Sequence, residues 1–439
     1  MSEALVGSFL LGSMFALFAI GLEIAFSMAL VGIAGLLFLS GWKVGLGVIG
    51  SIAWSNATSF TFIALPLFIF MSAILMHSGV GKGLFSAIAK WVGFLPGGMA
   101  VASVISCAVF SAVSGSSVAT AATIGMIAIP EMLKRGYSKP LIIGSLAAGG
   151  TLGILIPPSV PMILYGVMTE TSIGHLYAAG MIPGLLLALI FCAYVIGYAL
   201  RYPNEAPASP DDRATLGEKL RGLREIWPVA VLITVVLGAM YAGIVTPTEA
   251  AALGCLVSLL IAMTIRALSV EVMKKAFLET VRVTSMVMLI IIFSGIFSHV
   301  IALLGMPKAL LSGISSLGLP AWGFFILVFT ALLVIAYALE ELSVMIIILP
   351  ILFPLVTAFG FDPVWFGIIM VVWLEIGFIT PPVGLNLFVI QGMMPESTAA
   401  DVIRGTTPFV ILMILLVALL FVFPEIALWL PRQMMTAPR

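Results

Sequence analysis

Charged residues are scarce in this chain. Only 9% of its 439 residues are Asp, Glu, Lys or Arg, whereas 62% are apolar, and the mean hydropathy is +1.26. A soluble domain needs a polar shell that faces water, so this composition excludes an ordinary soluble protein. It indicates a chain whose surface largely meets lipid.

Residue clusters that mark several other function classes are also missing. The net charge is zero, so no basic surface for nucleic acid is expected. The three cysteines, Cys107, Cys192 and Cys255, lie in apolar runs without CxxC or Cys/His spacing, which predicts free thiols in the core. We find no HExxH, GxSxG or GxxxxGKS/T motif, so we expect no enzyme, no ATP hydrolysis and no bound cofactor.

Apolar runs long enough to cross a bilayer recur along the chain. About 20 residues of helix are needed to cross about 30 Å of hydrocarbon. We predict membrane helices at 4–22, 24–41, 61–77, 141–169, 175–200, 227–245, 248–265, 283–304, 361–394 and 408–427. The N-terminus carries Glu3 and lacks a basic n-region, so the first helix is expected to be retained. The predicted fold is an all-α polytopic membrane protein.

Two further apolar stretches, 97–130 and 320–359, are interrupted near their middle by small or polar residues. The arms on either side of residues 114–117 have about 13 to 16 residues, or roughly 20–24 Å of helix, which is too short to span. Two such arms can enter and leave the membrane on one side if their polar tip is buried in protein or lines a cavity. We therefore predict two re-entrant helical hairpins.

The distribution of Lys and Arg predicts the orientation of the chain, because cytoplasmic loops retain positive charge. Threading the predicted spans places 15 of the 19 basic residues on one side, and both termini on the other. The segment 201–226, rich in proline and charge, is then a cytoplasmic linker. It divides the chain into a first repeat, 1–200, and a second repeat, 227–439.

A shared pattern supports this division. A Gly-x-x-x-Pro-Pro string begins at Gly153 and again at Gly377, 224 residues later. The polar tip of each predicted hairpin, at Ser116 or Glu341, precedes the first proline of its pair by 41 or 40 residues. Since the two hairpins open from opposite sides in the predicted threading, we expect an inverted repeat with two broken membrane helices, about 141–169 and 361–394.

The two breaks predict the chemistry of the site. Consecutive prolines remove two backbone donors and end the helix, and a break within lipid is tolerated only where it faces protein, water or an ion. A simple proline kink is the alternative for each break alone. Unwound carbonyls and half-helix C-termini suit cations, whereas half-helix N-termini suit a carboxylate. Broken helices at matched positions are typical of secondary transporters.

Candidate ligands follow from these breaks. One sodium cage is predicted from Ser114, Gly115, Ser116, Gly153 and Pro157. A second is predicted from Glu340 or Glu341 with Gly377, Thr380 and Pro382. Candidate contacts to a substrate carboxylate are Ser117, Ser159 and Asn386. A helix cap or a partner contact is the alternative for the Glu340/Glu341 pair, and Glu375 stays open between a functional and a structural role.

Several strings resemble the DctM-type large subunit of TRAP transporters, and the resemblance covers essentially the whole chain. They are Ser114–Gly125, Gly150–Pro161, Phe361–Gly367 and Thr380–Asn386. The resemblance implies a sodium-driven, elevator-type permease in the inner (cytoplasmic) membrane. It also implies a small four-helix membrane subunit of DctQ type and a periplasmic binding protein of DctP type, which delivers an organic acid such as a C4-dicarboxylate.

Two features qualify this resemblance. Relatives often carry Gly four residues before the acidic residue of the second hairpin, where this chain has Ala336. The chain begins directly with membrane spans, so we expect the small subunit on a separate polypeptide. The alternative functions are a self-sufficient secondary carrier that needs no binding protein, a channel, and a membrane enzyme.

Overall fold

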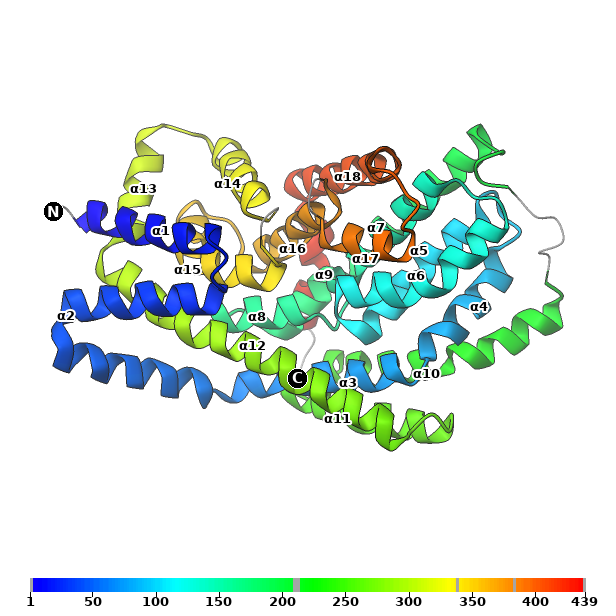
Figure 1. Cartoon of the computed structure of the whole chain (residues 1–439), viewed down its shortest axis with the longest axis horizontal. Coiled ribbons are helices and arrows are strands. Elements are labelled where there is room, and N and C mark those ends of the chain that lie inside the picture. Colours follow the sequence, from blue (N-terminus) through cyan, green and yellow to red (C-terminus); the bar gives the residue numbers. More distant parts are fainter. Residues whose placement is uncertain (1–2, 208–213, 337–338, 382–383, 437–439) are drawn as a thin grey trace.

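The computed structural model describes residues 3–207, 214–336, 339–381 and 384–436, and these residues form helices joined by short turns (Figure 1). No strand occurs among them. In this part of the chain eight helices are long and apolar enough to cross a membrane, or nine if a bent pair is counted as one span. The predicted all-α polytopic membrane protein is confirmed.

The first half of the chain runs from α1 to α9. Its helices are α1 (Glu3–Ala19), α2 (Ile24–Ala57), η1 (Phe60–Ile63), α3 (Ala64–His77), α4 (Val80–Val92), α5 (Gly98–Ser114), α6 (Ser117–Lys134), α7 (Lys139–Leu155), α8 (Val160–Met168) and α9 (Ile173–Arg201). The span predicted to end at residue 41 continues beyond a non-helical Gly41 as a second helical arm. The short helix α4 has no counterpart among the predicted spans.

The second half runs from α10 to α19. Its helices are α10 (Leu216–Tyr241), α11 (Pro247–Thr264), α12 (Val270–Leu303), α13 (Met306–Ser316), α14 (Ala321–Ala336), α15 (Glu341–Ala358), α16 (Pro363–Ile379), α17 (Leu385–Met393), α18 (Ala399–Val422) and α19 (Glu425–Thr436). A capping box between Thr215 and Glu218 starts α10. The part of the predicted linker from residue 216 onward is therefore helical.

The same order of elements occurs twice. A helix, a shorter helix, a pair of helices, a broken pair and a long helix occur as α3 to α9 and again as α12 to α18. Each broken pair lies where the Pro-Pro string predicts it. The predicted duplication itself stays a prediction.

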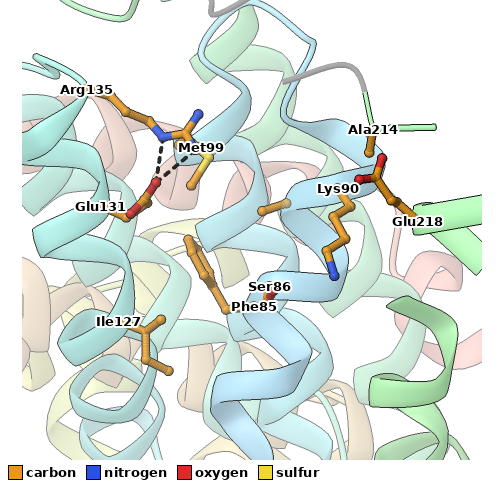
Figure 2. A pocket seen from close by; sticks show the side chains of 10 residues that line it. Phe85, Ser86, Lys90, Met99, Ile127, Glu131, Arg135, Ala214 and Glu218 are labelled. Atoms are coloured by element: carbon orange, nitrogen blue, oxygen red, sulfur yellow. Dashed lines mark hydrogen bonds and ion pairs between the residues drawn. The ribbon is translucent and has the colours of Figure 1, made fainter. Parts of the chain in front are cut away.

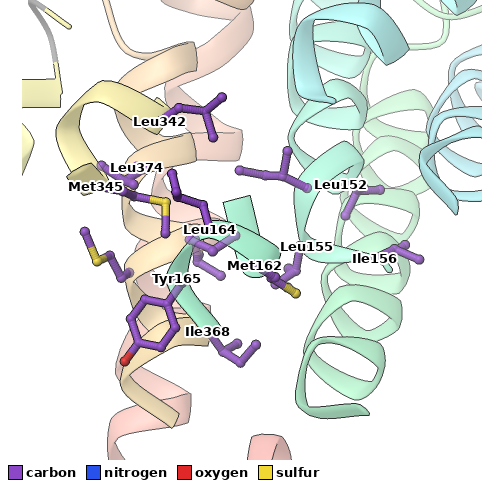
Figure 3. Packing of buried hydrophobic residues seen from close by; sticks show 14 of the residues in the cluster. Leu152, Leu155, Ile156, Met162, Leu164, Tyr165, Leu342, Met345, Ile368 and Leu374 are labelled. Carbon is purple, nitrogen blue, oxygen red and sulfur yellow. The ribbon is translucent and has the colours of Figure 1, made fainter. Parts of the chain in front are cut away.

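Helix α7 lies at the centre of the packing. It contacts α5, α6, α9, α16, α17 and α18, and every residue from Leu141 to Leu155 is buried. Close approach needs small residues here, since a Cβ on Gly144 would lie 2.2 Å from the Gly405 carbonyl oxygen of α18. Apolar side chains of α7, α8, α15 and α16 fill the space between the broken helices (Figure 3).

A second group of helices packs beside this centre. Helices α2, α3, α11 and α12 lie together along the lower edge of Figure 1, where α12 contacts both α2 and α3. Helix α12 also reaches α15, where the Ser294 hydroxyl donates to the carbonyl of Ile346 at 2.9 Å. Pro350 has no N–H to offer that carbonyl, so Ser294 supplies the donor that α15 itself lacks.

Candidate functional site

The first helix break joins α7 to α8. Helix α7 ends at Leu155, Ile156 is extended, and α8 begins at Val160 after a bend of 40°. The Ser159 hydroxyl caps α8 by accepting from the Met162 N–H at 3.4 Å. The Pro157–Pro158 peptide between the two helices is cis. The predicted break is present. The Ser159 hydroxyl, a predicted substrate contact, caps α8 in this structure.

The turn between α5 and α6 lies against this break. Gly115, with φ of 59°, ends α5, and a Cβ there would lie 3.0 Å from the Pro158 carbonyl oxygen. The Ser114 hydroxyl lies 2.5 Å from that of Thr120, which donates to the Ser116 carbonyl at 2.8 Å. A small cavity lies between this turn and the break, lined in part by Ser114, Gly115, Pro158 and Ser159.

Gly153 makes the contact between the two elements possible. A Cβ on Gly153 would lie 2.6 Å from the Ser116 carbonyl oxygen and 2.9 Å from Thr120 Oγ1. The α5–α6 turn and the α7–α8 break are therefore in contact. Four of the predicted ligands, Ser114, Gly115, Ser116 and Gly153, lie together at the break that contains Pro157. The Ser116 hydroxyl accepts from the Ala119 N–H at 3.4 Å and so caps α6.

The second break lies between α16 and α17. Thr380 is extended and its hydroxyl donates to the Ile376 carbonyl at 2.5 Å. Pro382, a predicted ligand, falls outside the described residues. A Cβ on Gly377 would lie 2.8 Å from the Ala336 methyl group. Ala336 therefore lies directly against the break.

The acidic residues before α15 differ in their surroundings. Glu340 occupies the N-cap position of α15 but makes no capping hydrogen bond with its side chain, and it is half-buried. Glu341 is buried in the first turn of the helix. Its carboxyl group lies within hydrogen-bonding reach of that of Glu375 on α16.

Glu375 joins the two halves of the chain. The Ser117 hydroxyl of α6 donates to Glu375 Oε2 at 2.9 Å, and the amide nitrogen of Asn386 on α17 donates to Ser117 Oγ at 2.6 Å. Glu375 is 1% exposed, and Ser117 and Asn386 are fully buried. Two of the three residues predicted to contact substrate, Ser117 and Asn386, are thus bonded to each other. Sequence reasoning singled out Glu375 as a buried acid, but could not find its partner 258 residues away.

Three buried oxygens around this chain of hydrogen bonds have no partner among the described residues. They are Glu341 Oε2, Glu375 Oε1 and Asn386 Oδ1. The two carboxyl groups can bond to each other only when one of them holds a proton. Buried polar atoms are rarely left without a partner, because the lost hydrogen bonds to water cost free energy. Side-chain oxygens of this kind are suitable ligands for a hard cation.

A larger cavity of about 500 Å³ lies away from both breaks. It lies between α4, α5, α6 and α10 and is lined by Phe85, Lys90, Glu131, Arg135 and Glu218, among others (Figure 2). Its charges are engaged, since Arg135 pairs with Glu131 at 2.8 Å and Lys90 with Glu225 at 3.6 Å. It contains none of the predicted site residues, so the buried centre at the breaks is the better candidate.

The fold and the site together define a class of protein. Broken helices that recur in both halves of a polytopic membrane protein, and meet at a buried polar centre, are how secondary transporters build their sites. The comparison with families is more specific. The family model for the tripartite ATP-independent periplasmic transporter, DctM component, matches residues 11–426. The chain belongs to this family: it is the large permease subunit of a TRAP transporter, and not an enzyme.

Individual relatives agree with this assignment. The chain is 40% identical to the C4-dicarboxylate TRAP transporter large permease protein DctM of Pseudomonas aeruginosa, over 86% of this chain and 88% of that protein. It is 35% identical to the DctM protein of Vibrio cholerae, over 95% of both chains. An ectoine permease of Halomonas elongata and a sialic acid permease of Vibrio cholerae are 31% and 30% identical, over 96% and 97% of this chain and 98% of each relative.

A solved structure shares the fold. The crystal structure of the Alcanivorax borkumensis YdaH transporter matches with a TM-score of 0.59 at 15% identity, over 89% of this chain and 90% of that one. At this identity the likeness concerns the arrangement of helices alone.

Proposed function

We propose that this TRAP permease subunit is sodium-coupled and imports an organic acid delivered by a periplasmic binding protein. The observation that carries the proposal is the oxygen-rich contact between the α5–α6 turn and the α7–α8 break. Hydroxyl groups of Ser114 and Thr120 and the Ser116 carbonyl meet there, against Gly153. Hydroxyl and carbonyl oxygens at a broken helix are the ligands that transporters use for sodium.

The first predicted sodium cage, Ser114, Gly115, Ser116, Gly153 and Pro157, is retained as part of this proposal. The second, at Glu340 or Glu341 with Gly377 and Thr380, is its counterpart in the other half. We place the substrate carboxylate near Ser117, Ser159 and Asn386, between the two breaks. The half-helix N-termini of α8 and α17 suit an anion there.

The membrane arrangement is also part of the proposal. Helices α5 and α14 have 17 and 16 residues, or roughly 24–26 Å of helix, short of the ~30 Å of hydrocarbon. The short first arms support re-entrant hairpins for α5–α6 and α14–α15 in the inner membrane, while α15 itself has the length and hydropathy of a span. The repeated order of helices supports two repeats, and the distribution of Lys and Arg gives them opposite orientations in the membrane. In this arrangement the hairpins and the broken helices move together as an elevator.

Partners and substrate follow from the family. A tripartite system needs a small membrane subunit and a periplasmic binding protein, and we expect both on separate chains. C4-dicarboxylates, ectoine, sialic acid and isethionate, which relatives are named for, all carry a carboxylate or a sulfonate group, which favours an organic acid as substrate here. A self-sufficient carrier is not favoured, because the family is tripartite.

Reconstitution tests the proposal. The permease is placed in proteoliposomes with the small subunit and the binding protein, and uptake of the acid bound by that protein is measured. We expect uptake under an inward sodium gradient, and loss of uptake when either partner is omitted. Full uptake by this chain alone, or full uptake with a proton gradient and no sodium, would contradict the proposal.

A further inference from the structure

Three helices bring unpartnered oxygens to the junction of the two halves. Glu341 Oε2 belongs to α15, Glu375 Oε1 to α16 and Asn386 Oδ1 to α17. Glu375 and Asn386 are 1% and 0% exposed, and Glu341 is 7% exposed. Helix α16 packs against both α15 and α17. The three oxygens therefore belong to neighbouring elements, and not to one helix end.

The hydrogen bonds in this region run in one direction. The Asn386 amide nitrogen can only donate, so Ser117 Oγ accepts from it at 2.6 Å. The single Ser117 O–H then donates to Glu375 Oε2 at 2.9 Å, which makes that oxygen an acceptor. With the amide nitrogen held by Ser117, the Asn386 carbonyl oxygen is left for another group. The chain of hydrogen bonds thus ends on the Glu375 carboxyl group, which accepts from Ser117 and lies beside a second acid.

No basic side chain neutralises these acids within the part of the chain that the structure describes. The ion pairs there involve Glu131, Glu225, Glu271, Glu279 and Glu425. A buried carboxylate without a counter-charge is expensive in a membrane protein, and such residues are usually functional. Two neighbouring carboxyl groups can both be ionised only when a cation lies between them, and otherwise a proton neutralises one of them.

We propose that Glu375, Glu341 and Asn386 form a cation site at the junction of the two halves, which shares Glu341 with the second predicted cage, and that sodium occupies it. The inference rests on the proposed sodium coupling, because it takes the ion from that function. It adds Glu375, which neither predicted cage contains.

The site would link parts that are far apart in the sequence. A cation held by Glu341 and Glu375 ties the first turn of α15 to α16. Through Ser117 the same carboxylate is bonded to α6, and through Asn386 to α17. Sodium at this position therefore stabilises the contact between the two halves, which a sodium-dependent thermal stability measures without any substrate.

The test uses the full-length permease, purified in detergent with its small membrane subunit. The midpoint of thermal unfolding is followed as sodium chloride replaces choline chloride at constant ionic strength. Glu375→Gln keeps an acceptor for Ser117 but removes the charge, so we expect the half-maximal sodium concentration to rise at least tenfold. Glu271→Gln, which alters an exposed pair with Lys275, is the matched control and should titrate as the wild type does.

A second variant covers the case in which Glu375→Gln does not fold. Glu375→Asp keeps the carboxyl group on a side chain that is one methylene shorter, and should raise the half-maximal sodium concentration about fivefold or more. A half-maximal sodium concentration equal to that of the wild type in either variant overturns the inference. So does a Glu375→Gln protein that is more stable than the wild type without sodium and still responds to sodium, because this result would indicate that Glu375 binds a proton. If the wild type itself shows no sodium response, the proposed function fails as well.

Discussion

Gly153 offers a sharp test of the contact between the α5–α6 turn and the first break. In Gly153→Ala the new Cβ would lie 2.6 Å from the Ser116 carbonyl oxygen and 2.9 Å from Thr120 Oγ1. Contacts of this length force the turn to shift. Overpacking of this kind costs about 1–3 kcal/mol, whereas Ala in place of Gly within a helix gains about 0.5–1 kcal/mol. The expected net loss of stability is roughly 0–2.5 kcal/mol.

The effect on sodium should exceed the effect on folding. If the turn relieves the strain by moving away from the break, sodium binding loses about the same 1–3 kcal/mol, which corresponds to roughly 5- to 150-fold in affinity. Sodium titrations of uptake, and of the thermal midpoint, measure this shift. The larger side chain of Gly153→Leu should abolish transport even at saturating sodium.

A matched substitution separates this contact from the general effect of replacing glycine. Gly197 lies within α9, and a Cβ there meets no atom within 4 Å. Gly197→Ala should therefore leave sodium dependence unchanged and stability equal or slightly higher. If Gly153→Ala gives the same sodium titration as Gly197→Ala, the turn and the break do not form a cation site.

Three further variants test separate parts of the account. Ser116→Ala removes the cap of α6 at a cost of about 0.5–2 kcal/mol, and should raise the sodium requirement roughly 5- to 30-fold if the hydroxyl also binds sodium; an unchanged sodium titration would leave it a cap alone. Ser294→Ala leaves the Ile346 carbonyl of α15 without a donor and should lower the free energy of unfolding by about 1–3 kcal/mol. The loss should exceed that of the control Ser258→Ala, whose hydroxyl bonds within its own helix, and equal thermal midpoints would show that the Ser294 hydrogen bond does not stabilise α15. Thr215→Cys in a cysteine-free background should resist an impermeant thiol reagent in intact cells, and labelling from outside would reverse the predicted topology.

Much of the fold follows from local chemistry and was therefore predictable. Proline has no N–H, so each Pro-Pro pair marks a helix break in any context, and the breaks after α7 and α16 occur where predicted. Residues 114–117 likewise mark the turn between α5 and α6. By contrast, the arm of α2 beyond Gly41 and the short helices α4 and α13 were not recognised, because each is too short or too mixed in polarity to resemble a span.

The site was predictable only in part. Spacing within each half placed Ser116 near Gly153, because a turn and a break in one repeat lie within one local unit. The contact of Ser117 with Glu375 joins residues 258 positions apart, and only the packing of α6 against α17 and of α7 against α16 creates it. A single sequence holds no local signal for such a pair. The sequence indicated only that Glu375 is an acidic residue within an apolar run.

The central claim is that sodium enters with the substrate through the centre formed by the two breaks. Uptake of radiolabelled sodium, measured in proteoliposomes that contain the permease and its membrane partner, tests this most directly. We predict that the loaded binding protein triggers sodium entry in step with substrate entry, and that the binding protein without substrate does not. Substrate uptake with no accompanying entry of labelled sodium would contradict the account.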